Sequence, residues 1–303
     1  MCMNKPKLWV MCGLPGSGKS YKAQQLAIEY EATIFSSDAL REEMFGDIND
    51  QKHNQELFVT LHRIIKDCLI RGRNTVYDAC NISYKRRMAF LRELKNIPCE
   101  KICIIMATPY DECLGRCTWR KEREVPLSVV QRMFFNFNIP YWYEGWDDIQ
   151  IEYGNFRGCY GKPKNFYDIY KNYDQRNMHH SLTLGDHCLK TAKLIDETNS
   201  VEVVCAAYIH DCGKPDVGRF VDSKGQPTTE RHYYNHQYTS GYKALFFDYS
   251  NPLDVAILVM WHMQPYFWER DNNEKLHNKY RKLWGEQLYE DIMRLHIADK
   301  NAH

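Results

Sequence analysis

The stretch Gly13-Leu14-Pro15-Gly16-Ser17-Gly18-Lys19-Ser20 decides the fold of the first half of the chain. An apolar run at residues 8–12 precedes it and helix-forming residues follow as far as residue 30, which predicts a strand, a glycine-rich loop and a helix. Glycines let consecutive backbone amides turn inward on a phosphate at the positive end of such a helix. The stretch therefore predicts a phosphate-binding loop, or P-loop, rather than an ordinary glycine-rich turn.

Each part of the predicted P-loop has its own task in binding a nucleoside triphosphate. We expect Lys19 to reach the terminal phosphates and Ser20 to supply a hydroxyl to Mg²⁺. The remaining contacts are expected from the backbone cradle of Gly13, Gly16, Ser17 and Gly18. The cofactor predicted for this half is ATP or another nucleoside triphosphate with Mg²⁺.

Further apolar runs at residues 32–35, 74–77 and 101–106, with a weaker one at 149–153, alternate with helical stretches. This alternation predicts an α/β domain with a mostly parallel sheet and helices on both faces. Ligands of such sheets bind at the carboxyl ends of the strands. Polar residues follow three of these strands, and the acceptor site is expected among them.

Asp38, after the second predicted strand, is the candidate general base of a phosphoryl transfer. A carboxylate beside the phosphate cradle can accept the proton of an acceptor hydroxyl and align it for in-line attack. The alternative is that Asp38 caps the helix that follows. Arg41, one turn on, is expected to bind a substrate phosphate or to orient Asp38. Asp78 is expected to hold Mg²⁺ through water, to contact the acceptor, or to satisfy backbone donors in its turn.

Three arginines in the stretch 116–126 stand at helical spacing: Arg116, Arg120 and Arg123. A lid bearing them would close over the nucleotide and neutralise the charge on the transferring phosphoryl group. The alternative is a solvated basic face paired with nearby glutamates. The P-loop upstream favours the lid, with Arg120 as its main catalytic residue.

Together these elements resemble the kinase domain of the polynucleotide 5′-hydroxyl kinases. The resemblance covers about half of the chain and rests on the P-loop, on Ser37-Asp38-Ala39-Leu40-Arg41, on Asp78-Ala79-Cys80-Asn81 with Arg86-Arg87, and on residues 116–126. It implies that Asp38 activates the 5′-hydroxyl and that Arg41, with Asp78 and Arg87, binds the acceptor strand. It also implies that Arg120 contacts the donor phosphates. One departure is Ala79-Cys80, where the family often carries Thr before Asn.

The second half carries histidines and aspartates at the ends of apolar helical runs. Residues 201–209 lead to His210 and Asp211, residues 254–261 lead to His262, and residues 290–298 lead to Asp299. Imidazoles and carboxylates brought together in this way suit one or two divalent ions, and a metal-bound water is a nucleophile near neutral pH. Although a single histidine is more often a core or surface residue, the whole set predicts a metal-dependent phosphohydrolase.

This set resembles the HD-domain phosphohydrolases over roughly residues 178–303, which implies an all-α domain. The resemblance implies His187, His210, Asp211 and Asp299 as core metal ligands, with His236 and His262 holding a second ion. The ions would be transition metals or Mg²⁺, and Asp211 would be catalytic. It further implies that Lys214 contributes to catalysis and that Lys214 and His180 bind the substrate. The alternative is a degenerate sensing module.

The two motif sets indicate two domains in the 303 residues: 1–155, a connector at 156–177, and 178–303. The connector is rich in Lys and aromatic residues, which favours a packed linker over a surface for single-stranded nucleic acid. The net charge of +1 gives no global field to attract a polyanion. The cysteines in apolar runs are typical of reduced core residues, and no apolar segment predicts a signal peptide or a membrane span, so we expect a cytoplasmic protein.

The preferred interpretation is a bifunctional end-healing enzyme for RNA or DNA. One half would phosphorylate 5′-hydroxyl ends, and the other would hydrolyse a 2′,3′-cyclic phosphate or a terminal phosphate. Its partners would be nucleic-acid ends (RNA favoured, including tRNA), a nucleoside triphosphate and a ligase acting downstream. The alternatives are a nucleoside or sugar kinase fused to a nucleotide phosphohydrolase, and a non-catalytic, nucleotide-gated RNA-binding module.

Overall fold

The computed structural model describes residues 5–119, 125–154, 160–178, 181–195, 200–270 and 273–302. The chain forms two compact units. The first contains Met1–Met133 and Pro140–Phe156, and the second contains Phe134–Ile139 and Arg157–His303. The P-loop lies in the first unit, and the histidines that follow residue 186 lie in the second.

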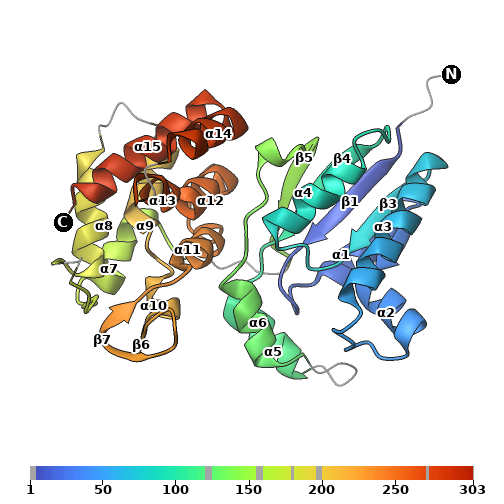
Figure 1. Ribbon diagram of the computed structural model, residues 1–303, viewed down its shortest axis with the longest axis horizontal. Coiled ribbons are helices and arrows are strands. Elements are labelled where there is room, and N and C mark those ends of the chain that lie inside the picture. Colours follow the sequence, from blue (N-terminus) through green and yellow to red (C-terminus); the bar gives the residue numbers. More distant parts are fainter. Residues whose placement is uncertain are drawn as a thin grey trace. The chain divides into compact units, whose positions relative to one another are not determined.

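The first unit is built on a five-stranded parallel sheet, as the sequence predicts (Figure 1). The strands run in the order β2-β3-β1-β4-β5. Their bounds are β1 Lys7–Cys12, β2 Thr33–Ser36, β3 Thr75–Asp78, β4 Glu100–Met106 and β5 Asp148–Glu152. Trp9 of β1 pairs with Val76 of β3 and with Ile102 of β4, so the P-loop leaves the central strand.

Helices cover both faces of this sheet because successive strand residues point to opposite sides. Trp9 and Met11 belong to a core cluster with Ala23 and Leu26 of α1. On the other face, Tyr77 of β3 packs edge-on against Phe90 of α4. The helices of this unit are α1 Lys19–Tyr30, α2 Ser37–Phe45, α3 Asn54–Ile70, α4 Tyr84–Glu93, α5 Tyr110–Trp119, most of α6 Leu127–Phe134, and the 3₁₀ turn η1 Trp142–Glu144.

The second unit is mainly helical, as the sequence predicts. Its elements are η2 Pro163–Asn165, α7 Phe166–Tyr170, α8 Leu184–Leu194, α9 Val201–Ile209, α10 Lys214–Val217, α11 His236–Ala244, α12 Pro252–Trp261, α13 Gln264–Arg270, α14 Glu274–Trp284 and α15 Glu286–Lys300. An antiparallel hairpin of β6 Arg219–Val221 and β7 Pro227–His232 lies between α10 and α11. This hairpin is an addition to the all-α domain that the sequence predicts.

Small residues let the helices of the second unit approach one another closely. A Cβ atom on Gly213 would lie 2.5 Å from the backbone nitrogen of Ser240 and 2.8 Å from the carbonyl oxygen of His236. A Cβ atom on Gly241 would lie 3.0 Å from Cβ of Met260. The loop after His210 and Asp211 is therefore held directly against α11, and α11 against α12.

The short segment Phe134–Ile139 belongs to the second unit although it lies within the first half of the sequence. The rings of Phe134 and Phe137 pack on Tyr242 of α11, with centroids 5.6 and 4.7 Å away. The backbone N–H of Ile139 lies 3.0 Å from Sδ of Met260 in α12. The predicted domain boundary at residue 155 instead places this segment in the first domain.

The described part of the predicted connector packs into the second unit. The backbone N–H of Tyr160 donates to the carbonyl of Phe246 at 2.8 Å, and that of Leu184 donates to Tyr173 at 3.0 Å. The ten cysteines among the described residues are free thiols. Within the same residues, no helix is long and apolar enough to cross a membrane.

Candidate active sites

The P-loop has a backbone that only glycine adopts without strain at two positions. Gly16 has φ +80° and Gly18, which precedes α1, has φ +92°. A Cβ atom on Gly16 would also lie 2.6 Å from the carbonyl oxygen of Cys113, and one on Gly13 would lie 2.6 Å from Oγ of Ser17. The loop is thus tightly wound at the start of α1, the conformation in which backbone N–H groups bind phosphate.

The side chains of the P-loop are arranged in a way that suits the binding of an anion. Nζ of Lys19 donates to the carbonyl oxygen of Leu14 at 2.8 Å, so the ammonium lies over the loop itself. Oγ of Ser17 is buried and has no hydrogen-bond partner among the described residues. The hydroxyl of Thr108, which follows β4, donates to the carbonyl oxygen of Ser17 at 2.9 Å and so helps to hold the loop in place. Ser20 is exposed at the start of α1, where its hydroxyl is open to a ligand.

One of the three predicted lid arginines lies in the described part of the chain, and it contacts the P-loop. Nη1 of Arg116, in α5, donates to the carbonyl oxygen of Gly16 at 3.2 Å, and its other end pairs with Glu112. The guanidinium therefore lies beside the phosphate cradle and also pairs with a nearby glutamate, as the alternative expects, so the lid role of Arg116 stays a prediction. Arg120 and Arg123 lie outside the described residues, and their roles stay predictions.

Asp38 lies in the first turn of α2, but it is Ser36 that caps this helix. Oγ of Ser36 accepts from the backbone N–H groups of Asp38 and Ala39 at 3.3 and 3.5 Å. The side chain of Asp38 is 42% exposed and lies 4.0 Å from Nη1 of Arg41. The residue that caps α2 is therefore Ser36 and not Asp38, and the general-base role of Asp38 stays a prediction.

Arg41 is buried, and its guanidinium is only partly bonded. Nη2 donates to Oδ1 of Asn54 in α3 at 2.9 Å, whereas Nε has no partner among the described residues. A buried cation with an unused donor suits an incoming phosphate or hydroxyl. Asp78, at the end of β3, is also buried and pairs in register with Ser36 of β2, so both strand ends meet at one edge of the sheet.

Arg87, predicted to bind the acceptor, has a buried structural partner. Its Nη2 and Nε lie 2.6 and 2.8 Å from the two carboxylate oxygens of Glu144, and both side chains are almost completely buried. Its Nη1 donates to the carbonyl oxygen of Asn81 at 3.0 Å. This geometry favours a role in holding the turn after β3 over direct contact with an acceptor.

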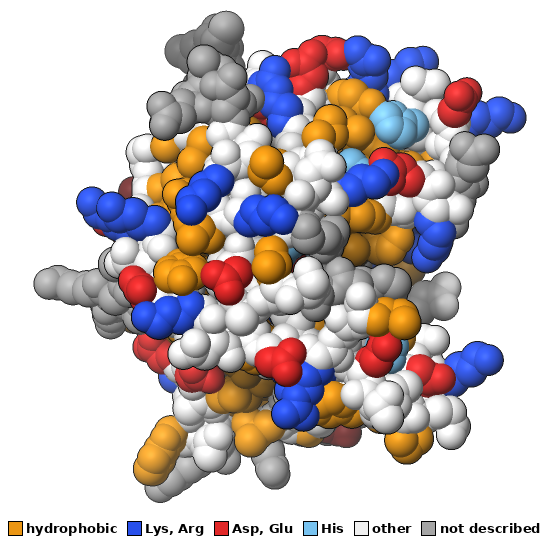
Figure 2. All heavy atoms as spheres, turned by 90° about the vertical axis from the view of Figure 1, so that its left-hand side faces the viewer, with side chains coloured by type: hydrophobic (Ala, Val, Ile, Leu, Met, Phe, Trp, Pro, Cys, Tyr) orange, Lys and Arg blue, Asp and Glu red, His pale blue; other side chains and the backbone are white. Residues whose placement is uncertain are grey.

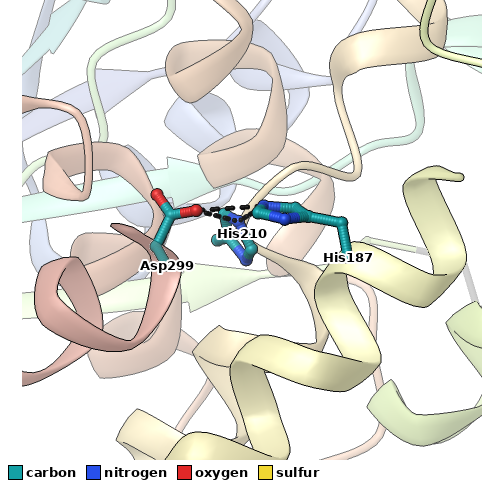
Figure 3. A group of neighbouring side chains, drawn as sticks. All are labelled: His187, His210 and Asp299. Atoms are coloured by element: carbon teal, nitrogen blue, oxygen red, sulfur yellow. Dashed lines mark hydrogen bonds and ion pairs between the residues drawn. The ribbon is translucent and has the colours of Figure 1, made fainter. Parts of the chain in front are cut away.

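The second unit brings His187 of α8, His210 and Asp299 of α15 together at its centre (Figure 3). Oδ1 of Asp299 lies 2.9 Å from Nε2 of His187 and 3.4 Å from Nε2 of His210, and the two Nε2 atoms are 3.2 Å apart. Ligands bound at about 2.0–2.2 Å around one ion stand at such separations from one another. The three buried side chains therefore fit one divalent ion.

A second group of three is centred on Asp211. Its Oδ1 lies 3.0 Å from Nε2 of His236 and 3.7 Å from Nε2 of His262, and those two nitrogens are 3.2 Å apart. Its Oδ2 lies 3.4 Å from Nε2 of His210, in the first group. Asp211 thus faces both groups, which is the arrangement expected of a carboxylate that bridges two ions.

The histidine tautomers prepare these groups for a metal. Nδ1 of His210, His236 and His262 lies 2.9, 2.8 and 2.6 Å from the carbonyl oxygens of Ala207, Tyr233 and Val259. Because a carbonyl only accepts, each Nδ1 carries a proton, and Nε2 is the nitrogen that faces the centre, where its lone pair can bind a metal once any proton on it has left. Two lone pairs facing each other at 3.2 Å repel unless a cation or a proton lies between them. The donor set therefore fits a metal centre.

Charged side chains at this centre also shift one another's pKa values. Burial opposes ionisation of Asp211, but the charges of Lys214 and His210 hold its pKa well below the usual range. Burial likewise opposes the charged form of His210, but the Asp211 carboxylate raises the pKa of His210 well above its usual value. Cys188 also lies within reach of His210 and Asp211, but burial raises the pKa of its thiol, which favours the protonated form. The carboxylates are therefore ionised and ready to bind a cation.

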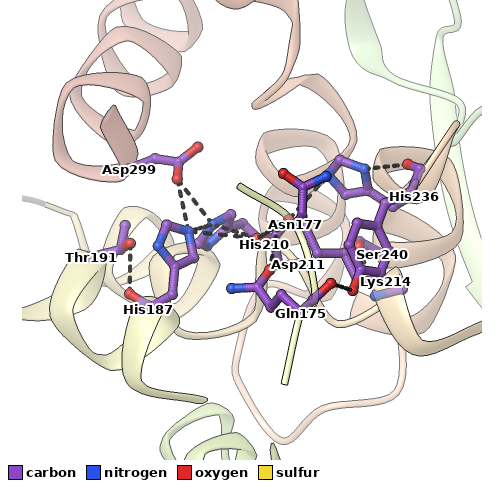
Figure 4. A network of polar contacts seen from close by, with 12 residues as sticks. Gln175, Asn177, His187, Thr191, His210, Asp211, Lys214, His236, Ser240 and Asp299 are labelled. Atoms are coloured by element: carbon purple, nitrogen blue, oxygen red, sulfur yellow. Dashed lines mark hydrogen bonds and ion pairs between the residues drawn. The ribbon is translucent and has the colours of Figure 1, made fainter. Parts of the chain in front are cut away.

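Two residues at this centre, Gln175 and Tyr266, were not identified from the sequence. Gln175, from the predicted connector, is buried, and its Oε1 accepts from Nζ of Lys214 at 2.9 Å (Figure 4). The hydroxyl of Tyr266, in α13, donates to Oδ2 of Asp299 at 3.2 Å. Nothing in the local sequence distinguishes either from an ordinary polar residue, because only the fold brings them to the metal ligands. His180, predicted to bind the substrate, lies outside the described residues.

Comparisons with known proteins divide the chain in the same way. Residues 8–140 match the AAA domain family, and residues 177–302 match the HD domain family. A search of the curated proteins finds no match.

Several solved structures are similar to parts of the chain. One from Chloroflexus aurantiacus j-10-fl, described as a kinase, is 20% identical and has a TM-score of 0.42, covering 50% of this chain and 86% of that one. A chain of the Pnkp1/Rnl/Hen1 RNA repair complex is 21% identical with a TM-score of 0.36, and the match covers 42% of each chain. A gluconokinase from Sinorhizobium meliloti 1021 is 18% identical with a TM-score of 0.35, covering 48% of this chain and 82% of that one. At these values the similarities carry no weight for substrate or activity.

Proposed function

We propose that this chain, which joins a P-loop kinase-like domain to an HD phosphohydrolase domain, heals nucleic-acid ends. The first domain would phosphorylate a 5′-hydroxyl end with a nucleoside triphosphate and Mg²⁺. The second would hydrolyse a 2′,3′-cyclic phosphate or a terminal phosphate. The observation that carries the proposal is that one chain holds both a P-loop with an acceptor-side Asp38–Arg41 pair and a buried His/Asp centre.

In the kinase half, each proposed role follows from position. The P-loop backbone and Lys19 would hold the triphosphate, and Ser20 would bind Mg²⁺. The half-exposed carboxylate of Asp38 would accept the proton of the 5′-hydroxyl while the hydroxyl oxygen attacks the terminal phosphorus of the nucleoside triphosphate. Arg41, with its unused Nε donor, would bind the acceptor strand. Arg116, Arg120 and Arg123 would neutralise charge on the transferring phosphoryl group.

In the HD half, His187, His210 and Asp299 would hold one ion, and Asp211, His236 and His262 would hold a second. Bound divalent ions supply Lewis acidity and lower the pKa of water. The protein's own part is to hold these six ligand side chains by buried backbone contacts and helix packing. Lys214 would neutralise a substrate phosphate, since its ammonium already faces Oδ2 of Asp211 at 2.7 Å. His180 would bind the substrate.

The proposal extends to the surroundings of the enzyme. Its substrates would be RNA ends in preference to DNA ends, tRNA among them, and a ligase would act on the healed ends. The cytoplasm, where nucleoside triphosphates and reduced thiols coexist, would be its location. The free cysteines of the described residues are compatible with such a compartment.

Incubation with γ-labelled ATP separates the candidate functions of the kinase half. We expect label to pass to an oligonucleotide with a 5′-hydroxyl end. Transfer only to nucleosides or sugars would replace the proposal with a small-molecule kinase. No transfer to any acceptor would support a nucleotide-gated binding module. The hydrolase half is tested in parallel, with Mn²⁺ or Mg²⁺ added, on oligonucleotides that end in a 2′,3′-cyclic phosphate or a 3′-phosphate.

A further inference from the structure

The end of the predicted connector runs beside the β6–β7 hairpin. The backbone N–H of Arg231 donates to the carbonyl oxygen of Arg176 at 2.8 Å, and Nδ2 of Asn177 donates to the carbonyl of Arg231 at 2.9 Å. The hydroxyl of Tyr233 donates to the carbonyl oxygen of Gln175 at 2.6 Å. Residues 173–177 and the hairpin thus form one continuous surface.

Arginines and aromatic rings alternate on the outer side of this surface. The guanidinium of Arg231 lies 5.1 Å from the ring centres of both Tyr173 and Phe220, and that of Arg176 lies 5.9 Å from Phe220. We call Tyr173, Arg176, Phe220 and Arg231 the hairpin platform. Phe220 is 37% exposed and the Arg176 side chain is 61% exposed, so the platform is open to solvent.

The platform is built with backbone strain at one of its arginines. Arg176 has φ +45°, a left-handed conformation that a residue with a long side chain rarely adopts. Its backbone N–H donates to Oδ1 of Asp174 at 2.8 Å, which stabilises this turn. Such strain persists where the surroundings over-determine it and is concentrated at functional sites.

The inner side of the same residues reaches the metal ligands. Gln175, between platform residues Tyr173 and Arg176, accepts from Nζ of Lys214, which faces Asp211 (Figure 4). The Lys214 ammonium also lies 5.4 Å from the ring centre of Tyr233, directly after β7. The segment that carries Tyr173 and Arg176 therefore also contacts Lys214 at the His/Asp centre.

Acidic groups near the platform are partly occupied by local turns. Oδ1 of Asp222 accepts from the backbone N–H groups of Lys224 and Gln226, both at 2.8 Å, at the tip of the hairpin. Arg219, next to Phe220, is exposed and adds a further cation. On the face that Figure 2 shows, lysine and arginine side chains lie among hydrophobic ones, with acidic side chains between them. This mixture suits a ligand with both charge and aromatic faces better than a simple anion.

We propose that the hairpin platform binds the single-stranded nucleotides next to the end that the HD domain hydrolyses. The proposal rests on the proposed function of that domain. Arg176 and Arg231 would contact the backbone phosphates, and the exposed ring of Phe220 would stack with a base. Single strands are bound in this way by grooves that combine cations with aromatic rings, and the contacts tolerate many sequences.

The test compares two substrates with the same reactive end. One is a ten-nucleotide RNA that ends in the phosphate hydrolysed by the wild type, and the other is the corresponding mononucleotide. We expect kcat/KM to be at least about tenfold higher for the RNA. Arg176→Gln and Phe220→Ala should each lower the RNA value on the order of 3- to 10-fold and leave the mononucleotide value unchanged.

Arg281→Gln is the matched control. Arg281 is also exposed and lies 5.1 Å from an aromatic ring, that of Tyr289, but it is in α14, away from the hairpin in sequence and fold. It should leave both substrates unaffected. Equal kcat/KM for the two wild-type substrates, or equal losses on both substrates in the platform variants, would overturn the platform while the HD activity stood.

A binding measurement keeps the platform testable if the hydrolase assignment fails. Fluorescence anisotropy of a labelled ten-nucleotide RNA gives log Kd against log salt concentration. Arg176→Gln should reduce the slope by roughly 0.7, because one counterion fewer is released from the single strand. An unchanged slope, or equal affinity of the wild type for a duplex of the same length, would overturn the platform even in a protein that hydrolyses neither substrate.

Discussion

Nζ of Lys214 lies 2.7 Å from Oδ2 of Asp211, and both side chains are buried. The two residues are three positions apart in the chain. Gly213, which lies between them, lets this segment pack against α11. Lys214 therefore neutralises part of the negative charge of Asp211. A substrate phosphate that enters this centre would meet an ammonium already fixed in place by Asp211 and Gln175, so little side-chain entropy remains to be lost on binding.

Separate substitutions should divide the two activities. Lys19→Ala removes the ammonium over the P-loop and should abolish phosphorylation, while metal-dependent hydrolysis continues near the wild-type rate. Asp211→Ala removes the carboxylate that faces both ligand groups and should do the reverse. Both activities are measured on the same purified preparations. If Asp211→Ala still hydrolysed phosphate ends at a normal rate, its place as the shared ligand would be wrong.

Asp38 and Ser36 should separate catalysis from helix capping. Asp38→Asn should lower the kinase kcat by about 10²- to 10⁴-fold, because the amide cannot accept the proton of the acceptor hydroxyl. It should leave stability unchanged, since Ser36 supplies the cap. Ser36→Ala should instead destabilise the first unit by about 1 kcal/mol in denaturant unfolding. Near-normal phosphorylation by Asp38→Asn would contradict the general-base role.

Metal affinity should rise with pH. The Asp211 carboxylate raises the pKa of His210 well above its usual value despite the opposing effect of burial, so the metal-free centre holds a proton on His210 at neutral pH. A metal must displace that proton, and the apparent affinity should increase about tenfold per pH unit until the pH passes the raised pKa. Titration calorimetry with Mn²⁺ at pH 6.5, 7.5 and 8.5 measures the trend. Repeating the titration in buffers of different ionisation enthalpy counts the protons released when the metal binds. A metal affinity that does not change with pH would contradict the proton on His210.

The buried pair of Arg87 and Glu144 should be essential to the stability of the first unit. Glu144→Gln leaves the Arg87 guanidinium buried without a counter-charge and should cost about 3–5 kcal/mol. Replacing both residues, with Arg87→Met and Glu144→Leu, should cost much less because no charge is stranded. Chemical denaturation of both variants measures the difference. If Glu144→Gln cost under about 1 kcal/mol, the pair would not have the importance that its burial indicates.

Much of the fold follows from local sequence patterns. The parallel sheet is predicted because short apolar runs alternate with amphipathic stretches, and its strands occur where those runs stand. His210, Asp211 and His262 are predictable because they follow the apolar helices α9 and α12, and helices that share a core bring their ends together. The hairpin after α10 is not predicted, since β6 has only three residues, β7 is mostly polar, and the hairpin is held in place by contacts with residues 173–177 that are distant in sequence.

By itself the sequence indicated a phosphate-binding loop in one half and a set of metal-ligating residue types in the other, because glycine geometry and ligand type are local properties of residues. Tertiary structure alone decided which groups cooperate. It placed Ser36 instead of Asp38 at the helix cap, bound Arg87 to Glu144, and carried Gln175 and Tyr266 to the metal ligands. The physical reason is that hydrogen bonds and ion pairs between distant segments depend on packing of the whole core, which no short stretch encodes.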